Sequence, residues 1–98
     1  MYRKRADKNQ YQFAAAIRLR GYFWEDKHSC GLGVSDGIMC NLAKTHCEWV
    51  EIKSSARGKL TDKEREFFDI CPGGPPILAW TPELAIAEFE TRALAVKR

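Results

Sequence analysis

Residues 47–53, Cys47-Glu48-Trp49-Val50-Glu51-Ile52-Lys53, have an alternating side-chain pattern that is typical of a β-strand. In an extended chain Val50 and Ile52 point to one side. Glu51 and Lys53 point to the opposite side. The sequence therefore predicts a strand that carries a carboxylate and an ammonium group two positions apart on one face.

The segments on both sides of this strand contain start and stop signals. Good helix formers run from about Asp7 to Arg20 and end at Gly21. Thr61 and Glu64 have the spacing of a capping box, in which a hydroxyl and a carboxylate satisfy free N–H groups at a helix start. The predicted elements are a helix at 7–20, strands at 22–24, 38–40 and 47–53, a helix at 61–70, a strand at 77–80 and a helix from 81 onward.

This order of elements predicts the fold class. Three strands joined by short connections favour an antiparallel meander, and a helix before the fourth strand favours a right-handed parallel crossover. We therefore expect a mixed α/β (α+β) fold of order αβββαβα, in which helices flank a mixed four-stranded sheet.

Length and composition favour one globular domain covering residues 1–98. Two independent cores would each fall below the usual folding size, and 45% hydrophobic residues suffice for one modest core. The longest apolar run has five residues, from Phe13 to Ile17, which is too short to span a bilayer. The basic start Arg3-Lys4-Arg5 lacks the hydrophobic stretch of a signal peptide. We therefore expect an intracellular, cytoplasmic protein without a membrane partner.

Four cysteines accompany two histidines, His28 and His46. Without a secretion signal, we expect reduced thiols that pack as small apolar groups rather than disulfides. Zinc sites usually contain close cysteine pairs, whereas here successive cysteines are 10, 7 and 24 positions apart, which disfavours a zinc site. The cysteines are Cys30, Cys40, Cys47 and Cys71.

The basic residues favour, without requiring, a polyanionic partner. The chain has 16 Lys and Arg against 13 Asp and Glu, and most of the cations precede residue 66. Cations distributed in this way can follow a phosphate backbone, although solvated helix faces would explain them equally well. Our candidates for nucleic-acid contacts are Arg18, Arg57, Lys59 and Lys63.

The expected hairpin geometry brings a second carboxylate to the charged strand face. Asp36 stands at the entry to strand two, next to the strand that carries Glu51 and Lys53. Two carboxylates near the carbonyl of Ile52 form an all-oxygen site that suits Mg²⁺ or Mn²⁺ better than zinc. Lys53 can orient a water nucleophile or stabilise the developing oxyanion, so the implied reaction is phosphodiester hydrolysis.

Three short motifs in the right order carry a family resemblance. Gly33-Val34-Ser35-Asp36, then Trp49-Val50-Glu51-Ile52-Lys53, then Gly58-Lys59-Leu60-Thr61 resemble the PD-(D/E)XK nuclease superfamily, and within it the small VRR-NUC nucleases. The resemblance covers roughly residues 7 to 90 and implies a restriction-endonuclease-like core. It also implies a metal-dependent DNA endonuclease that is selective for branched DNA, flaps or Holliday junctions, and a homodimer that presents two sites. Such an enzyme would suit DNA repair or recombination.

The same resemblance implies the roles of the site residues. Asp36 and Glu51 would bind the metal ion, and Lys53 would serve the attacking water. The first helix of that family often contributes a Glu, whereas this chain offers Gln10, which could hold a metal-bound water, with Asp7 about 60° away around the helix. At the helix after strand three, where the family commonly has Gln, this chain has Glu64, which could simply complete a cap.

Other interpretations stay open at this point. Asp36 could be an ordinary turn residue before Gly37, and Glu51 with Lys53 could form a solvated strand face. Trp49 could stack on an unpaired base, although packing is its simpler explanation. The alternatives to a nuclease are a non-catalytic nucleic-acid-binding module with the nuclease fold and a protein interaction domain.

Overall fold

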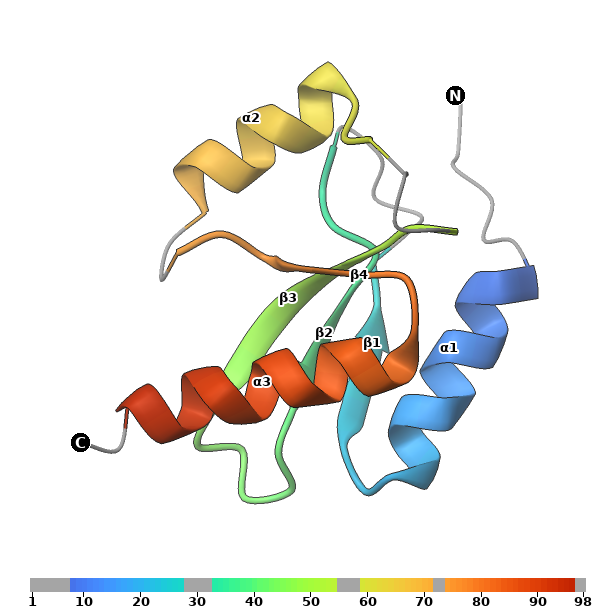
Figure 1. The fold of residues 1–98 in the computed structure, drawn as a ribbon, viewed down its shortest axis with the longest axis vertical. Helices are drawn as coiled ribbons and strands as arrows, with labels where there is room; N and C mark the ends of the chain where they lie inside the picture. Colours follow the sequence, from blue (N-terminus) through green and yellow to red (C-terminus); the bar gives the residue numbers. More distant parts are fainter. Residues whose placement is uncertain (1–7, 28–32, 55–58, 72–73, 97–98) are drawn as a thin grey trace.

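The computed structural model describes residues 8–27, 33–54, 59–71 and 74–96. Three helices and four strands occupy these ranges (Figure 1). The elements are α1 (Lys8–Leu19), β1 (Phe23–Asp26), β2 (Gly37–Cys40), β3 (Cys47–Ile52), α2 (Asp62–Ile70), β4 (Ile77–Ala79) and α3 (Pro82–Val96). Within the described ranges, no helix has the length and apolar character needed to cross a bilayer.

The four strands form one mixed sheet, which confirms the expected α+β class. Their order in space is β1-β2-β3-β4, with antiparallel pairing between the first three and parallel pairing between β3 and β4. Helix α2 lies in the connection between the two parallel strands. In the register, Val50 stands opposite Gly37 on β2 and Ile77 on β4.

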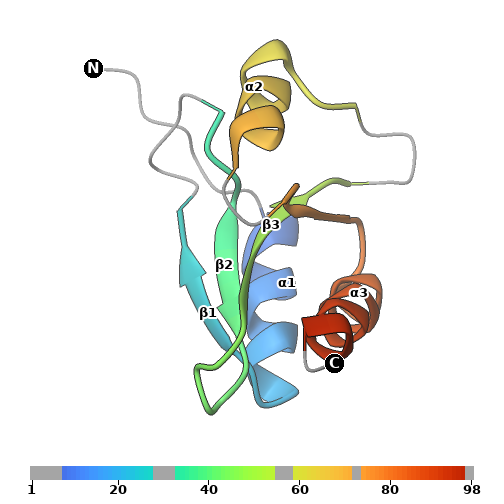
Figure 2. The same cartoon turned by 90° about the vertical axis from the view of Figure 1, so that its left-hand side faces the viewer.

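Helices α1 and α3 cover one face of the sheet (Figure 2). Val50 and Ile52 point into this layer, as the alternation of β3 predicted. Helix α2 contacts the opposite face, where the rings of Trp49 and Phe67 meet edge-on with centroids 5.1 Å apart. The hydrophobic core consists of Phe13, Ala14, Ile17, Trp24, Met39, Val50, Ile52, Ile77, Ala79, Ala85, Ile86 and Phe89.

One expectation about the cysteines is wrong. Cys40 and Cys47 form a disulfide, whereas the sequence favoured reduced thiols. The two residues are directly opposite each other in the β2–β3 ladder, with Cα atoms 4.1 Å apart. This proximity comes from the strand register, whereas the expectation of reduced thiols was based only on the cellular compartment. Cys71 is a buried thiol, as expected, and the expectations about Cys30 and His28 concern positions outside the described residues.

Gly37 provides a test of the packing between β2 and β1. A Cβ atom at this position would lie only 2.6 Å from Cε2 of the Trp24 indole. We therefore expect Gly37→Ala to lower the free energy of unfolding by about 1–3 kcal/mol in urea titrations, because an added methyl overpacks a closed core. Combining it with Trp24→Phe, which shortens the obstructing ring, should cost less than the sum of the single changes. If the two changes in the free energy of unfolding simply added, the contact between Gly37 and Trp24 would be contradicted.

Candidate active site

Asp36 links three elements of the fold at the point where β2 begins. The residue is 2% exposed. Oδ1 accepts a hydrogen bond from Gln10 Nε2 at 2.8 Å, and Oδ2 accepts one from the backbone N–H of Ile52 at 2.7 Å. These partners come from α1 and the end of β3, so the carboxylate does far more than complete a local turn.

Glu51 is a buried carboxyl group with little to balance its charge. Its exposed fraction is 1%, and Oε1 has no hydrogen-bond partner among the described residues. Burial, followed by the negative charges of Asp36 and Glu64, raises the pKa of Glu51 to about 9. Lys53 opposes this shift only in part. Glu51 therefore lies in a buried acidic cluster with Asp36 and Glu64 and not on a solvated strand face.

Lys53 is held between two carboxyl groups. Its Nζ donates a hydrogen bond to Glu64 Oε1 at 2.8 Å and lies 3.6 Å from Glu51 Oε2. Burial alone would raise the pKa of Glu64, but hydrogen bonds from Lys53 and from the backbone N–H of Thr61 lower it below its usual range. The Glu51 carboxyl also shares a hydrogen bond with Glu64. At neutral pH this arrangement keeps a proton on Glu51 and a negative charge on Glu64.

The capping box predicted at the start of α2 is confirmed. Glu64 N–H donates to Thr61 Oγ1 at 3.2 Å, and Thr61 N–H donates to Glu64 Oε1 at 2.9 Å. The ion pair between Glu64 and Lys53 was missed, because the cap alone already explained a Glu at this position. Its only sequence signal was an acid in the first turn of the helix that follows Lys53.

Of the two candidates on the first helix, the structure describes Gln10. Gln10 lies on α1 and donates its amide hydrogen to Asp36, so it orients that carboxylate. Asp7 lies outside the described residues. The described helix thus presents a neutral amide where a third acid was considered.

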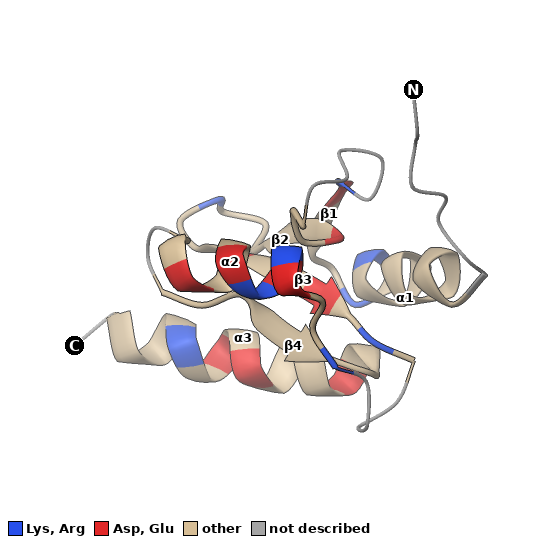
Figure 3. Ribbon diagram, turned by 90° about the horizontal axis from the view of Figure 1, so that it is seen from above, with Lys and Arg blue, Asp and Glu red and all other residues tan. Residues whose placement is uncertain are grey.

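The residues expected to contact nucleic acid lie in different surroundings. Lys59 and Lys63 are exposed, Lys63 is next to Glu64 in the chain, and Lys63 forms a loose surface pair with Glu66 at 3.8 Å. Figure 3 shows basic and acidic segments interleaved along α2 near the end of β3. Arg18 donates to the carbonyl of Trp24 at 3.1 Å and lies about 12 Å along α1 from Gln10. Arg57 lies outside the described residues.

The donor atoms fit a hard divalent cation, although the site has few acids. Among the described residues, no group of three or more His, Cys, Asp or Glu side chains is arranged to hold a metal ion. Asp36 and Glu51 are nevertheless neighbouring buried carboxyls, and the unpartnered Oε1 of Glu51 is an orphaned acceptor. A carboxylate oxygen such as those of Asp36 has two lone pairs and can accept more than one interaction. The Ile52 carbonyl is the remaining candidate ligand.

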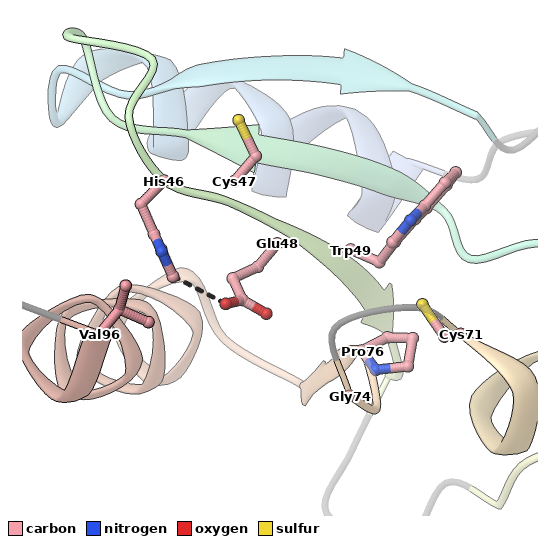
Figure 4. A pocket seen from close by; sticks show the side chains of 8 residues that line it. All are labelled: His46, Cys47, Glu48, Trp49, Cys71, Gly74, Pro76 and Val96. Carbon is pink, nitrogen blue, oxygen red and sulfur yellow. Dashed lines mark ion pairs between the residues drawn. The ribbon is translucent and has the colours of Figure 1, made fainter.

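A second charged cluster lies away from this site and was not expected from the sequence. Glu48 Oε2 lies 2.7 Å from His46 Nε2, beside a cavity of about 260 Å³ (Figure 4). Glu48 Oε1 accepts from Arg92 on α3 at 2.8 Å. Cys71 lines the same cavity, and burial with the charge of Glu48 raises the pKa of its thiol. The cluster thus joins β3 to α3 and contains a protonated, unreactive thiol.

We compared the chain with protein-family models, curated proteins and solved structures, and no match was found in any of the three comparisons.

Glu51 makes stability depend on pH in a defined direction. In the unfolded chain Glu51 ionises at its ordinary pKa of 4.5, whereas in the folded protein it keeps its proton up to about pH 9. The folded state binds the extra proton, so Glu51 lowers the free energy of unfolding progressively as pH rises from 4.5 to 9.

We expect Glu51→Gln to remove this penalty. In EDTA at pH 7.5, the variant should be more stable than the wild type by on the order of 2 kcal/mol in urea titrations, because an amide cannot ionise. At pH 4 the difference should vanish, since both states of the wild type then carry the proton. If the stability difference between Glu51→Gln and the wild type did not change with pH, Glu51 would not be a buried carboxyl group that keeps its proton at neutral pH.

Proposed function

We propose that this protein is a Mg²⁺- or Mn²⁺-dependent DNA endonuclease with a restriction-endonuclease-like core of the PD-(D/E)XK type, similar to the VRR-NUC nucleases. One observation carries the proposal. Asp36, Glu51 and Lys53, which are up to 17 positions apart in the sequence, form one largely buried cluster at the end of β3. A buried pair of carboxyls beside a lysine is an arrangement that cation-assisted phosphoryl chemistry uses.

Each residue of the cluster has a role in this proposal. Asp36, Glu51 and the Ile52 carbonyl would hold the cation, and Gln10 keeps Asp36 oriented through its hydrogen bond. When bound, a divalent cation lowers the pKa of water and offsets negative charge on the scissile phosphate. Lys53 would orient the attacking water or stabilise the charge that develops on the phosphoryl oxygens. The net reaction adds water across one phosphorus–oxygen bond of the backbone.

The substrate follows from size and charge. A domain of 98 residues has little surface for base readout, so contacts to phosphates by Lys59 and Lys63 would dominate over sequence recognition. Selectivity would come from the shape of branched DNA, flaps or Holliday junctions. A homodimer with two sites would cover such a substrate better than one subunit.

A second candidate is a nucleic-acid-binding module that keeps this fold without cleaving DNA. It is favoured by Gln10, which places an amide next to Asp36 and leaves the described site with fewer acids than a two-ion centre needs. Cleavage that requires a metal ion would indicate the nuclease, and DNA binding without cleavage would indicate the binding module.

The first test is cleavage of labelled duplex, flap and four-way-junction DNA with Mg²⁺, Mn²⁺ or EDTA. We expect cleavage with either metal, none in EDTA, and a loss of about 10²-fold or more in Lys53→Met, because its charge would act in the transition state. Lys44→Met removes an exposed ammonium above the Phe23 ring and is the matched control. Tight binding of every DNA without metal-dependent cleavage would favour the module.

The second test measures how salt weakens DNA binding. In the Glu51→Gln variant, which would bind DNA without cutting it, the logarithm of affinity should fall linearly with the logarithm of salt concentration. Replacing both Lys59 and Lys63 by Gln should reduce the slope by about 2, because each lysine releases about one counterion. Arg20→Gln is the control, since Arg20 pairs with Glu83 away from the site. Equal slopes in all three proteins would exclude this surface as the phosphate contact.

A further inference from the structure

We propose that Glu64 is a positioning residue for Lys53: its Oε1 atom is fixed by the helix cap of α2 and in turn fixes the ammonium group beside the Asp36–Glu51 pair. The inference deepens the proposed function and rests on the role assigned there to Lys53. It assigns a task to a side chain that helix capping alone would explain.

The geometry at Glu64 Oε1 carries the argument. This single atom accepts Thr61 N–H at 2.9 Å and Lys53 Nζ at 2.8 Å. Glu64 is a buried charged residue, with 6% of its surface exposed. A side chain that only completes a cap would normally remain at the surface, because both partners of a cap lie at an exposed helix end. Here the cap turns the carboxylate inward, onto the neighbouring strand.

Lys53 needs such an anchor. Its stem has four rotatable bonds, and ordering a lysine side chain costs up to about 2 kcal/mol in rotamer entropy. Glu51 Oε2 is 3.6 Å from Nζ, too far for a good hydrogen bond, so Glu64 supplies the short contact that fixes the position of the ammonium. The Lys53 side chain is 15% exposed, which limits the water that could compete for it.

The first turn of α2 is itself held in place by the loop that leads to Asp36. Gly33 has φ +82° and packs so closely on α2 that a Cβ would come within 2.8 Å of Lys63 Cβ and would overlap the Lys63 carbonyl. The segment that leads to Asp36 thus packs directly against the first turn of α2, which carries Glu64.

Three substitutions separate position from charge. Glu64→Gln keeps the reach and the acceptor oxygen but removes the charge, Glu64→Asp keeps the charge but shortens the reach, and Glu64→Ala removes both. If Glu64 acts by position, kcat for DNA cleavage should fall less than about 5-fold in the Gln variant and about 10²-fold in the Asp and Ala variants. KM should change little in all three, because Glu64 is too deeply buried to contact DNA. Activity kept by Asp and lost by Gln would overturn the proposal.

A matched pair of cap variants controls for helix stability. Thr61→Ala and Thr81→Ala each remove a hydroxyl that accepts a backbone N–H at 3.2 Å, at α2 and α3 respectively. Thr61→Ala should lower kcat several-fold, because the turn holding Glu64 loosens, whereas Thr81→Ala should leave kcat unchanged. Equal effects of the two on kcat would overturn the proposal.

A readout that is independent of cleavage keeps this inference separate from the proposed function. In ¹³C,¹⁵N-labelled protein, the Lys53 ammonium, assigned by its loss in Lys53→Met, should exchange its hydrogens slowly in the wild type and in Glu64→Gln. Exchange should be at least about 10-fold faster in the Asp and Ala variants, which lose the short hydrogen bond. Unchanged exchange in those variants would overturn the positioning role even if the protein cuts DNA. If no form cuts DNA, the proposed function fails and the exchange rates alone decide whether Glu64 anchors Lys53.

Discussion

The hydrogen bond from the Ile52 N–H to the Asp36 carboxylate determines where the sheet opens. The β2–β3 ladder ends where Gly37 stands opposite Val50, and the next N–H of β3 on that side, at Ile52, needs another acceptor. Asp36 supplies it with a side chain instead of a backbone carbonyl, while the Lys53 N–H continues the pairing with Ala79 on β4. Strand β2 can therefore end here without leaving a buried donor unpaired, and Asp36 is held beside the strand that carries Glu51.

Two acids on β3 show that burial alone does not create the unbalanced acidic cluster around Glu51. Glu48 and Glu51 are both largely buried, but the two oxygens of Glu48 face His46 and Arg92, and the Arg92 guanidinium balances its charge. Glu51 faces two other carboxyl groups and shares one lysine with Glu64. The first arrangement stabilises the junction of β3 with α3. The second costs stability at neutral pH, and such a cost is typical of sites that are retained for chemistry.

The elements and the central residues of the site were predictable because they depend on local signals. Alternation defined β3, the capping box defined the start of α2, and hairpin geometry brought Asp36 to the strand that carries Glu51 and Lys53. The remaining features depend on register and side-chain reach. The disulfide requires Cys40 to face Cys47 across the ladder, and the Arg92–Glu48 pair joins positions 44 residues apart. Neither distance is encoded in a local sequence pattern.

The start of α2 connects the packing of the fold to the side chains of the candidate site. Its cap uses Glu64 Oε1, its first turn packs against the glycine that precedes Asp36, and its Phe67 ring holds the helix on the outer face of β3. A shift of this helix would move the lysine anchor relative to both carboxyls, because Glu64 Oε1 is the short contact of the Lys53 ammonium. We therefore expect the geometry of the site to depend on the position of α2.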